Sequence, residues 1–170
     1  RTAGFNTADL TALSETGQTL TIGLMLIGGS PGSTAGGMKT TTAAVLIACA
    51  IAIFRRRENG RFFGRRISDE TVKNAVTVFL MYISLFLLGG MIISRVENLP
   101  ILTCLFETAS AIGTVGLTLG ITPGLHAVSK LILICLMFLG RVGGLTLIFA
   151  TLSANKNTLS KLPLEKITVG

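Results

Sequence analysis

The sequence of 170 residues has few charged residues, few aromatic residues and few side chains of the kinds that bind metals. It contains no Trp, one Tyr and one His, and 14% of its residues are charged, whereas a soluble domain carries about 25%. Its three cysteines, Cys49, Cys104 and Cys135, stand in apolar runs and form no CxxC pair, which argues against a disulfide scaffold and a cysteine metal site. The low charge argues against a soluble enzyme, and we predict neither catalytic residues nor a covalently bound cofactor.

Two long stretches carry no charge at all, namely residues 16–38 and residues 75–94. A helix needs roughly 20 apolar residues to span a bilayer, and both stretches reach that length. We therefore predict an all-α integral membrane protein. Because the sequence starts without Met and without a signal-peptide pattern, we expect it to be the C-terminal fragment of a longer transporter or channel.

The formal net charge of +7 comes mainly from two basic clusters. Seven Lys and Arg residues lie in residues 55–73, and three more lie in residues 153–170. Basic clusters beside membrane spans mark the cytoplasmic side, so we predict that residues 75–94 run outward and residues 127–152 return inward. Nucleic-acid binding is not expected, because only two aromatic residues accompany the arginines and a stacking platform needs more.

The sequence contains an internal repeat with an offset of 112 residues. The offset aligns residues 24–28 with residues 136–140, and it aligns Thr2, Ala3, Gly4 and Phe5 with Thr114, Val115, Gly116 and Leu117. Such self-similarity indicates repeated structural units. We predict one complete unit, residues 74–152, and the end of a preceding unit, residues 1–54.

The complete unit is expected to contain an outer helix, a short pore helix, a filter loop and an inner helix. Their predicted ranges are 75–94, 101–112, 113–118 and 127–152, the last one interrupted at Arg141 and at Gly143-Gly144. The short helix starts after Pro100 and ends at Gly113. With about 12 residues at 1.5 Å each it reaches about 18 Å, which is too short to cross a bilayer. We therefore predict a re-entrant loop, with both glycine-containing loops toward the outer face.

The two aligned loops have the composition of a cation filter. Irregular backbone at membrane depth is tolerated where it is buried in protein or lines a watery cavity, and its carbonyl oxygens can replace the hydration shell of an ion. Glycine permits torsions that turn successive carbonyls toward one axis, and the negative end of the short helix favours a cation. A single Thr-Val-Gly favours an ordinary turn, but its second copy favours a filter. The predicted ion-binding residues are Thr2, Ala3, Gly4, Phe5, Thr114, Val115, Gly116 and Leu117.

A glycine-rich run lies between two apolar runs, residues 20–27 and 43–54. Residues 28–42 hold five glycines and one proline in their first ten positions, so an uninterrupted helix cannot persist there. A phosphate-binding loop is not favoured, because that motif needs Gly next to Lys and Met38 separates them here. We predict an intramembrane gate below the filter, formed by Gly28, Gly29, Gly32, Gly36, Gly37 and Lys39 together with Arg141.

Two charged residues stand inside the predicted membrane segments. Arg141 falls near the middle of residues 131–152, where a charge costs at least roughly 2.5–3.5 kcal/mol and where snorkelling to a helix end is least effective. We expect its guanidinium to face the pore, where it repels cations, or to hold the glycine-rich run. Glu107 lies in the short helix and either neutralises Arg141 or holds a filter loop from behind.

Four motifs together resemble the Trk/Ktr/HKT superfamily of potassium transporters, most closely its KtrB-type membrane subunits. The motifs are the residues 1–6, the glycine-rich residues 28–41, the loop 113–118 and the segment 140–147. The resemblance implies four repeats of membrane helix, pore loop and membrane helix, of which this sequence would hold the end of the third and all of the fourth. The pair Gly143-Gly144 departs from the Gly-Pro of many relatives, which concerns helix shape rather than the assignment.

The resemblance further implies a function and partners. It implies a multi-pass potassium uptake subunit of a bacterial cell membrane, with residues 28–42 gating the pore and Arg141 projecting into it. It also implies a homodimer on a cytosolic ring of nucleotide-binding RCK-domain subunits, with the tail at residues 164–170 contributing to subunit contacts. The alternative is a sodium-permeable or sodium-coupled relative, since the first filter loop is absent. A membrane-embedded nucleotide-dependent enzyme and a structural scaffold also stay open, and ATP hydrolysis and ion flux distinguish them.

Overall fold

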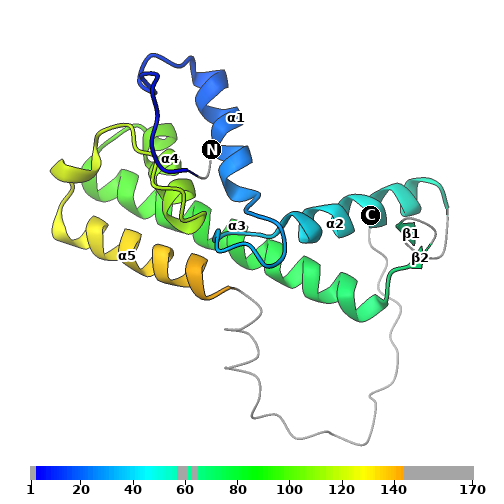
Figure 1. Cartoon of the computed structure of the whole chain (residues 1–170). Coiled ribbons are helices and arrows are strands. Elements are labelled where there is room, and N and C mark those ends of the chain that lie inside the picture. Colours follow the sequence, from blue (N-terminus) through cyan, green and yellow to red (C-terminus); the bar gives the residue numbers. More distant parts are fainter. Residues whose placement is uncertain (1–2, 57–60, 63–64, 144–170) are drawn as a thin grey trace, which may run out of the picture.

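The computed structural model describes residues 3–56, 61–62 and 65–143. Along the chain the elements are α1 (Glu15–Leu26), α2 (Thr40–Phe54), β1 (Arg61–Phe62), β2 (Arg65–Arg66), α3 (Asp69–Glu97), α4 (Ile101–Ile112), the 3-10 turn η1 (Thr122–Gly124) and α5 (Ala127–Val142). The regular structure of the described chain is helical apart from one pair of two-residue strands (Figure 1), in agreement with the predicted all-α class. The predicted tail at residues 153–170 lies outside the described residues.

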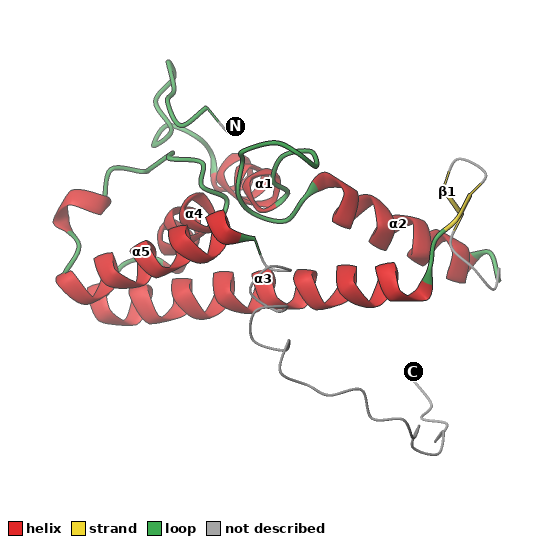
Figure 2. Cartoon of the chain, turned by 60° about the horizontal axis from the view of Figure 1, so that its bottom comes forward, coloured by secondary structure: helices red, strands yellow, loops and turns green. Residues whose placement is uncertain are grey.

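The long helix α3 is the backbone of the fold. Figure 2 shows α4 and α5 over its C-terminal half and α2 over its N-terminal half. Among the described residues, α3 is the one helix long and apolar enough to cross a membrane, while α2 and α4 are shorter apolar helices. It extends beyond the predicted range of 75–94, because Ser68 caps its first turn by accepting a hydrogen bond from the Thr71 N–H and because the left-handed Asn98 ends it.

The short helix α4 lies at the centre of the packing. It contacts α1, α3 and α5, and all its residues from Phe106 to Ile112 are buried. Its bounds coincide with the range expected from the sequence, because Pro100 precedes its first turn and Gly113 follows its last. Phe106, Cys104 and Ile112 are fully buried, so α4 is the apolar core around which the other helices are arranged.

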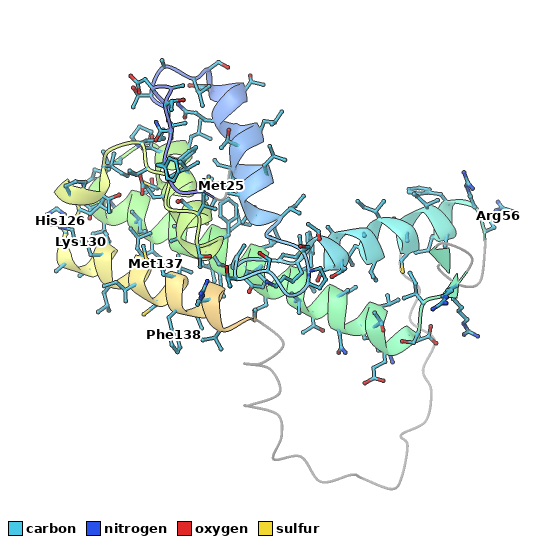
Figure 3. The ribbon with its side chains drawn as sticks, viewed as in Figure 1. Met25, Arg56, His126, Lys130, Met137 and Phe138 are labelled. Carbon is cyan, nitrogen blue, oxygen red and sulfur yellow. The ribbon has the colours of Figure 1, made fainter. Side chains whose placement is uncertain are left out.

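Helices α3 and α5 carry many large apolar side chains that are exposed. In Figure 3 the labelled Met137 and Phe138 extend outward from α5. The exposed large apolar residues of the two helices are Val76, Leu80, Leu87, Leu88, Met91, Ile92, Val96, Val128, Leu131, Ile134, Met137 and Phe138. A helix that is apolar both toward the core and toward its surroundings is typical of a membrane protein.

A hydrogen-bonded cluster joins the C-terminal end of α3 to the start of α5. The Glu97 carboxylate accepts hydrogen bonds from the Ser129 hydroxyl and from the backbone N–H of His126 at 2.9 Å, and it forms an ion pair with the exposed His126 ring at 2.8 Å. These contacts, the Ser129 hydroxyl first, hold the pKa of Glu97 below its ordinary value. Since Glu97 lies beyond the apolar residues 75–94, the cluster fixes the helix ends outside the predicted span.

Three predicted boundaries need correction. The basic segment 55–73 is not a plain loop, since β1 and β2 pair antiparallel, with Arg61 opposite Arg66, and α3 already begins at Asp69. The glycine-rich loop ends at Lys39 rather than at residue 42, because the N–H groups of Thr42 and Ala43 bond to the Lys39 carbonyl and so start α2.

The inner helix was expected over residues 127–152, but α5 ends at Val142. Gly143 has a φ of 86°, which lies outside the helical region and stops the helix there. Residues 144–152 lie outside the described residues. Arg141 consequently stands in the last turn of α5 and not in the middle of a long helix.

Candidate functional site

The two loops aligned by the internal repeat meet in space. Gly4 and Gly116 both have left-handed torsions, with φ values of 81° and 90°. A Cβ added to Gly4 would lie 2.6 Å from the Val115 carbonyl oxygen, and a Cβ added to Gly116 would lie 3.3 Å from the Gly4 Cα. Two backbones approach this closely only where both residues lack a side chain. Ala3 and Phe5 flank Gly4 and are exposed, while Thr2 lies outside the described residues.

Residues 114–117 continue directly from α4. The Thr114 N–H bonds to the Ala111 carbonyl at 3.0 Å, and the Val115 N–H bonds to the Ser110 carbonyl at 2.9 Å. Thr114 has a φ of 50°, which is a rare torsion for a β-branched residue. The side chains of Val115 and Leu117 are buried while Gly116 is exposed, so the side chains anchor the loop and the Gly116 backbone stays accessible.

A cavity of about 740 Å³ runs beside this loop. Its lining includes Thr114, Val115, Gly116 and Leu117, and it extends to Arg141 near one end of α5. The remaining lining residues are Glu107, Ser110, Ala111, Thr118, Thr122, Pro123, Leu133, Met137 and Phe138. The cavity thus connects one predicted filter segment with the predicted gate arginine.

Glu107 is the buried charged residue behind the loop. Glu107 is only 4% exposed, and its carboxylate contacts the segment that follows Leu117. The Leu119 N–H donates to Oε1 at 3.0 Å, and the Thr122 hydroxyl donates to Oε2 at 2.9 Å. The Thr118 hydroxyl also donates to Oε1. The sequence left two roles open for Glu107, namely neutralising Arg141 or holding a filter loop. In the structure Glu107 binds the loop, and Arg141 has a different partner.

The glycine-rich loop, residues 27–39, is closed by its own backbone. The Gly28 N–H donates to the Met38 carbonyl at 2.6 Å, and the Thr40 N–H donates to the Gly29 carbonyl at 3.1 Å. The Lys39 ammonium lies inside the loop, at 3.1 Å from the Ser33 carbonyl oxygen and 2.8 Å from the Ala35 carbonyl oxygen. Because this segment is not a helix, the two carbonyl groups have no helical hydrogen-bond partner, and the ammonium serves as their donor instead.

The glycine-rich loop contacts both the filter segment and α5. The Gly36 N–H donates to the Thr114 hydroxyl at 2.8 Å, the Gly37 N–H donates to the Gly140 carbonyl at 3.3 Å, and the Arg141 guanidinium donates to the Thr34 carbonyl. A Cβ added to Gly36 would lie 2.5 Å from a Thr114 side-chain atom and 2.9 Å from the Gly140 carbonyl. The loop therefore fits against its neighbours only with glycine at position 36.

The predicted gate residues divide into two groups. Gly28, Gly36, Gly37, Lys39 and Arg141 lie at the contacts just described. Gly29 is half-buried within the loop beside Ser33. Gly32 is exposed, has a φ of 84° and has no neighbour near its α-carbon, so it shapes a turn at the loop tip and does not touch the filter.

Sequence reasoning missed two residues that bind the loop. Thr114 was assigned to the filter through its backbone, whereas its hydroxyl is also the acceptor for Gly36. Gly140 was noted only in the repeat and in the motif 140–147, yet a Cβ at this position would lie 2.0 Å from the Ile112 carbonyl. The one available signal was the alignment of Gly140 with Gly28.

The site has no set of side chains for a tightly bound metal ion. Among the described residues, no three His, Cys, Asp or Glu side chains converge. In Figure 3 the sole histidine, His126, lies at one end of the molecule beside Lys130, and Arg56 lies at the opposite end. Any ion at the loops 3–5 and 114–117 would be held by backbone and hydroxyl oxygens, which suit hard cations.

Comparison with known proteins identifies the chain's relatives. The family model described as "TrkH: Cation transport protein" matches residues 1–159. The potassium/sodium uptake protein NtpJ of Enterococcus hirae is 43% identical over the whole chain and 39% of its own length. The Ktr system potassium uptake protein B is 40% identical in Bacillus subtilis, over 88% of this chain and 34% of the relative. In Vibrio alginolyticus it is 34% identical, over the whole chain and 37% of the relative.

The chain thus spans less than two fifths of the length of these curated relatives. Their names and the family description are those of transporters, in agreement with the expectation that the chain is not an enzyme. The resemblance given by the four motifs is confirmed over nearly the full chain. The chain belongs to the TrkH family of cation transport proteins, within its Ktr-like branch.

Proposed function

We propose that the chain forms part of the membrane subunit of a potassium uptake system. Potassium passes a filter of backbone carbonyls to which residues 2–5 and residues 114–117 contribute two of four walls. The observation that carries this proposal is the close approach of Gly4 and Gly116, both left-handed and both in the aligned loops. Two such loops in contact, one of them at the end of the short buried helix α4, meet the requirements of a cation filter.

The glycine-rich loop, with Arg141, acts as the gate of this pathway. The support for this role is that the loop bonds to Thr114, the first residue of the filter segment, and to Arg141 and Gly140 on α5. With these bonds intact the loop lies against the filter segment and the guanidinium charge opposes cations. Opening then requires that the loop leave Thr114 and α5 together.

The transport step is passive in this proposal. An inside-negative membrane potential contributes ~2.3 kcal/mol per elementary charge per 100 mV, which is enough to concentrate a monovalent cation without a bound cofactor. The basic segment 55–73 lies on the cytoplasmic side by the positive-inside rule. The proposed partners are a second membrane subunit, giving a homodimer, and a cytosolic ring of nucleotide-binding RCK-type subunits. In support, two relatives are named as uptake proteins of a Ktr system.

A second candidate is a sodium-permeable or sodium-coupled transporter. The observation that favours it is the name of the relative at 43% identity, a potassium/sodium uptake protein. The architecture of filter and gate is the same in both candidates. They differ only in the ion that the complete filter prefers.

The decisive test is ion flux through the full-length gene product in proteoliposomes with an imposed inside-negative potential. Potassium uptake that sodium barely inhibits supports the first candidate, and equal sodium uptake supports the second. If no flux of either ion appears after addition of the regulatory ring and nucleotide, the transport proposal is wrong.

Replacement of Gly116 by Ser tests the filter itself. A side chain at a φ of 90° costs about 1–3 kcal/mol of strain, and the new Cβ presses on the Gly4 backbone. We expect the apparent KM for potassium to rise by about tenfold or more. Gly120→Ser is the matched control, because Gly120 has a φ of 87° with open space around it. Equal KM values in Gly116→Ser and the wild type would remove this loop from the filter.

A further inference from the structure

The buried Glu107 carboxylate holds the chain that leaves the filter segment, but the proposed filter and gate assign it no part in the choice of ion. Three donors surround it, namely the Leu119 N–H at 3.0 Å, the Thr122 hydroxyl at 2.9 Å and the Thr118 hydroxyl. No basic side chain pairs with it among the described residues, where the one ion pair joins His126 to Glu97. All three donors belong to one segment, residues 118–122, which follows the filter segment.

Helix α4 therefore holds residues 114–117 at both ends. At the first end, the carbonyls of Ser110 and Ala111 accept the N–H groups of Val115 and Thr114. At the second end, Glu107, one turn earlier on α4, binds Thr118 and Leu119 through its side chain. Residues 114–117 are thereby attached at both ends to one rigid helix whose second half is buried.

A carbonyl filter discriminates between potassium and sodium through the number and spacing of its oxygens. A segment fixed at both ends cannot contract around the smaller ion, whereas a segment released at one end can adapt to it. Three hydrogen bonds to one buried acceptor are costly to leave unmade. They are suited to keep the outer end of the filter in place.

We propose that Glu107 is a positioning residue that sets the preference for potassium over sodium by clamping the outer end of the filter segment. The inference rests on the proposed function, since it assumes that residues 114–117 line the ion path. Glu107 acts through Thr118, Leu119 and Thr122 and does not itself touch the ion.

The test compares the apparent KM values for potassium and sodium in Glu107→Ala and Glu107→Gln. The alanine variant removes all three bonds, and we expect the ratio of the sodium KM to the potassium KM to fall by about tenfold or more. Glutamine keeps an acceptor oxygen for the Leu119 N–H, and its amide can donate to the Thr122 hydroxyl. It is therefore expected to stay within about threefold of the wild-type ratio. Thr103→Ala, on the same helix but outside the cavity lining, is the control and should leave the ratio unchanged.

A general loss of folding would lower the maximal rate and the amount of protein in the membrane without changing the KM ratio. If Glu107→Ala is not recovered in the membrane, Thr122→Val removes the bonds of the Thr122 hydroxyl to Oε2 and to the Thr118 hydroxyl, and the ratio should then fall by about two- to threefold. An unchanged ratio in the recovered variants overturns the clamp. Equal losses in the alanine and glutamine variants also overturn it, since charge and not hydrogen bonding would then matter. If Gly116→Ser changes potassium uptake while the Glu107 variants do not, the filter stands and only the clamp fails.

Discussion

Helices α1 and α5 start 112 residues apart, at Glu15 and Ala127, which is the offset of the internal repeat. Their paths diverge after Leu26 and its aligned partner Phe138. Beyond α1 the chain turns into the glycine-rich loop, whereas α5 continues through Arg141 to Val142. Position 29 is a glycine in one segment and position 141 an arginine in the other.

Because of this difference, the two aligned segments of the repeat play different structural roles. The first supplies a loop whose N–H and carbonyl groups lie outside any helix, and the second supplies the groups that bind it, the Gly140 carbonyl and the Arg141 guanidinium. The small residue is needed in both, because a Cβ at Gly28 would lie 2.1 Å from the Gly36 carbonyl and a Cβ at Gly140 would lie 2.0 Å from the Ile112 carbonyl. Asymmetry between the segments thus creates a contact that two identical segments would lack.

The largest effect is expected from removing the loop's side of this contact. Deleting residues within 32–37 takes away groups that bond to Thr114, Gly140 and Arg141. Two neutral hydrogen bonds and one charge-assisted bond amount to about 3 kcal/mol or more, so we expect potassium flux at saturating substrate to rise by about a hundredfold or more. Flux is measured in proteoliposomes per mole of incorporated protein.

Ser30→Ala serves as the control for the deletion, because the Ser30 side chain is exposed and its carbonyl bond to Ser33 is kept. This variant should conduct like the wild type. A deletion variant that is stable and has wild-type flux would show that the loop does not gate the pathway.

A smaller effect is expected from removing the arginine side. In Arg141→Ala the Thr34 carbonyl loses its charged donor, which weakens the closed arrangement by about 1.5–3 kcal/mol. We expect flux without the regulatory ring to rise by about tenfold or more. Lys130→Ala is the control on the same helix, since Lys130 binds the Pro123 carbonyl at the far end of α5.

Arg141→Lys separates the two proposed actions of the arginine. Lysine keeps the positive charge but loses the planar fork of donors. Flux close to wild type would indicate that the charge is the barrier, while flux close to that of the alanine variant would indicate that the bond to Thr34 matters more. If Arg141→Ala folds with unchanged thermal stability and conducts no faster than the wild type, the arginine is not part of the gate.

The sequence predicts these helices to different degrees, and the reasons are physical. The bounds of α4 follow from local signals, because Pro100 and Gly113 mark its two ends. The end of α5 at Val142 was not expected, since the glycine pair at 143–144 was treated as an interruption of a continuing helix. The start of α3 at Asp69 depends on a cap by Ser68 inside a polar segment, where hydropathy carries no signal.

The candidate site divides in the same way. Gly4 and Gly116 could be singled out from the sequence, because a position that needs a left-handed backbone torsion favours glycine. The partners of Glu107 and Thr114 could not, because Thr122 lies 15 residues from Glu107 and Gly36 lies 78 residues from Thr114. Such long-range hydrogen bonds depend on how the helices pack, and the presence of a Thr in the sequence does not indicate which N–H group its hydroxyl will bind.

The smallest effect is expected where the loop meets the filter segment directly. Thr114→Val keeps the shape of the side chain but removes the acceptor of the Gly36 N–H, so one neutral hydrogen bond of about 0.5–1.5 kcal/mol is lost. We expect about a two- to tenfold rise in flux without the regulatory ring, with an unchanged KM for potassium because the backbone of the segment is retained. Thr114→Ser keeps the hydroxyl and should conduct like the wild type. Since Gly140 and Arg141 still bind the loop in Thr114→Val, a rise as large as that of the deletion would mean that the filter contact, and not α5, holds the loop closed.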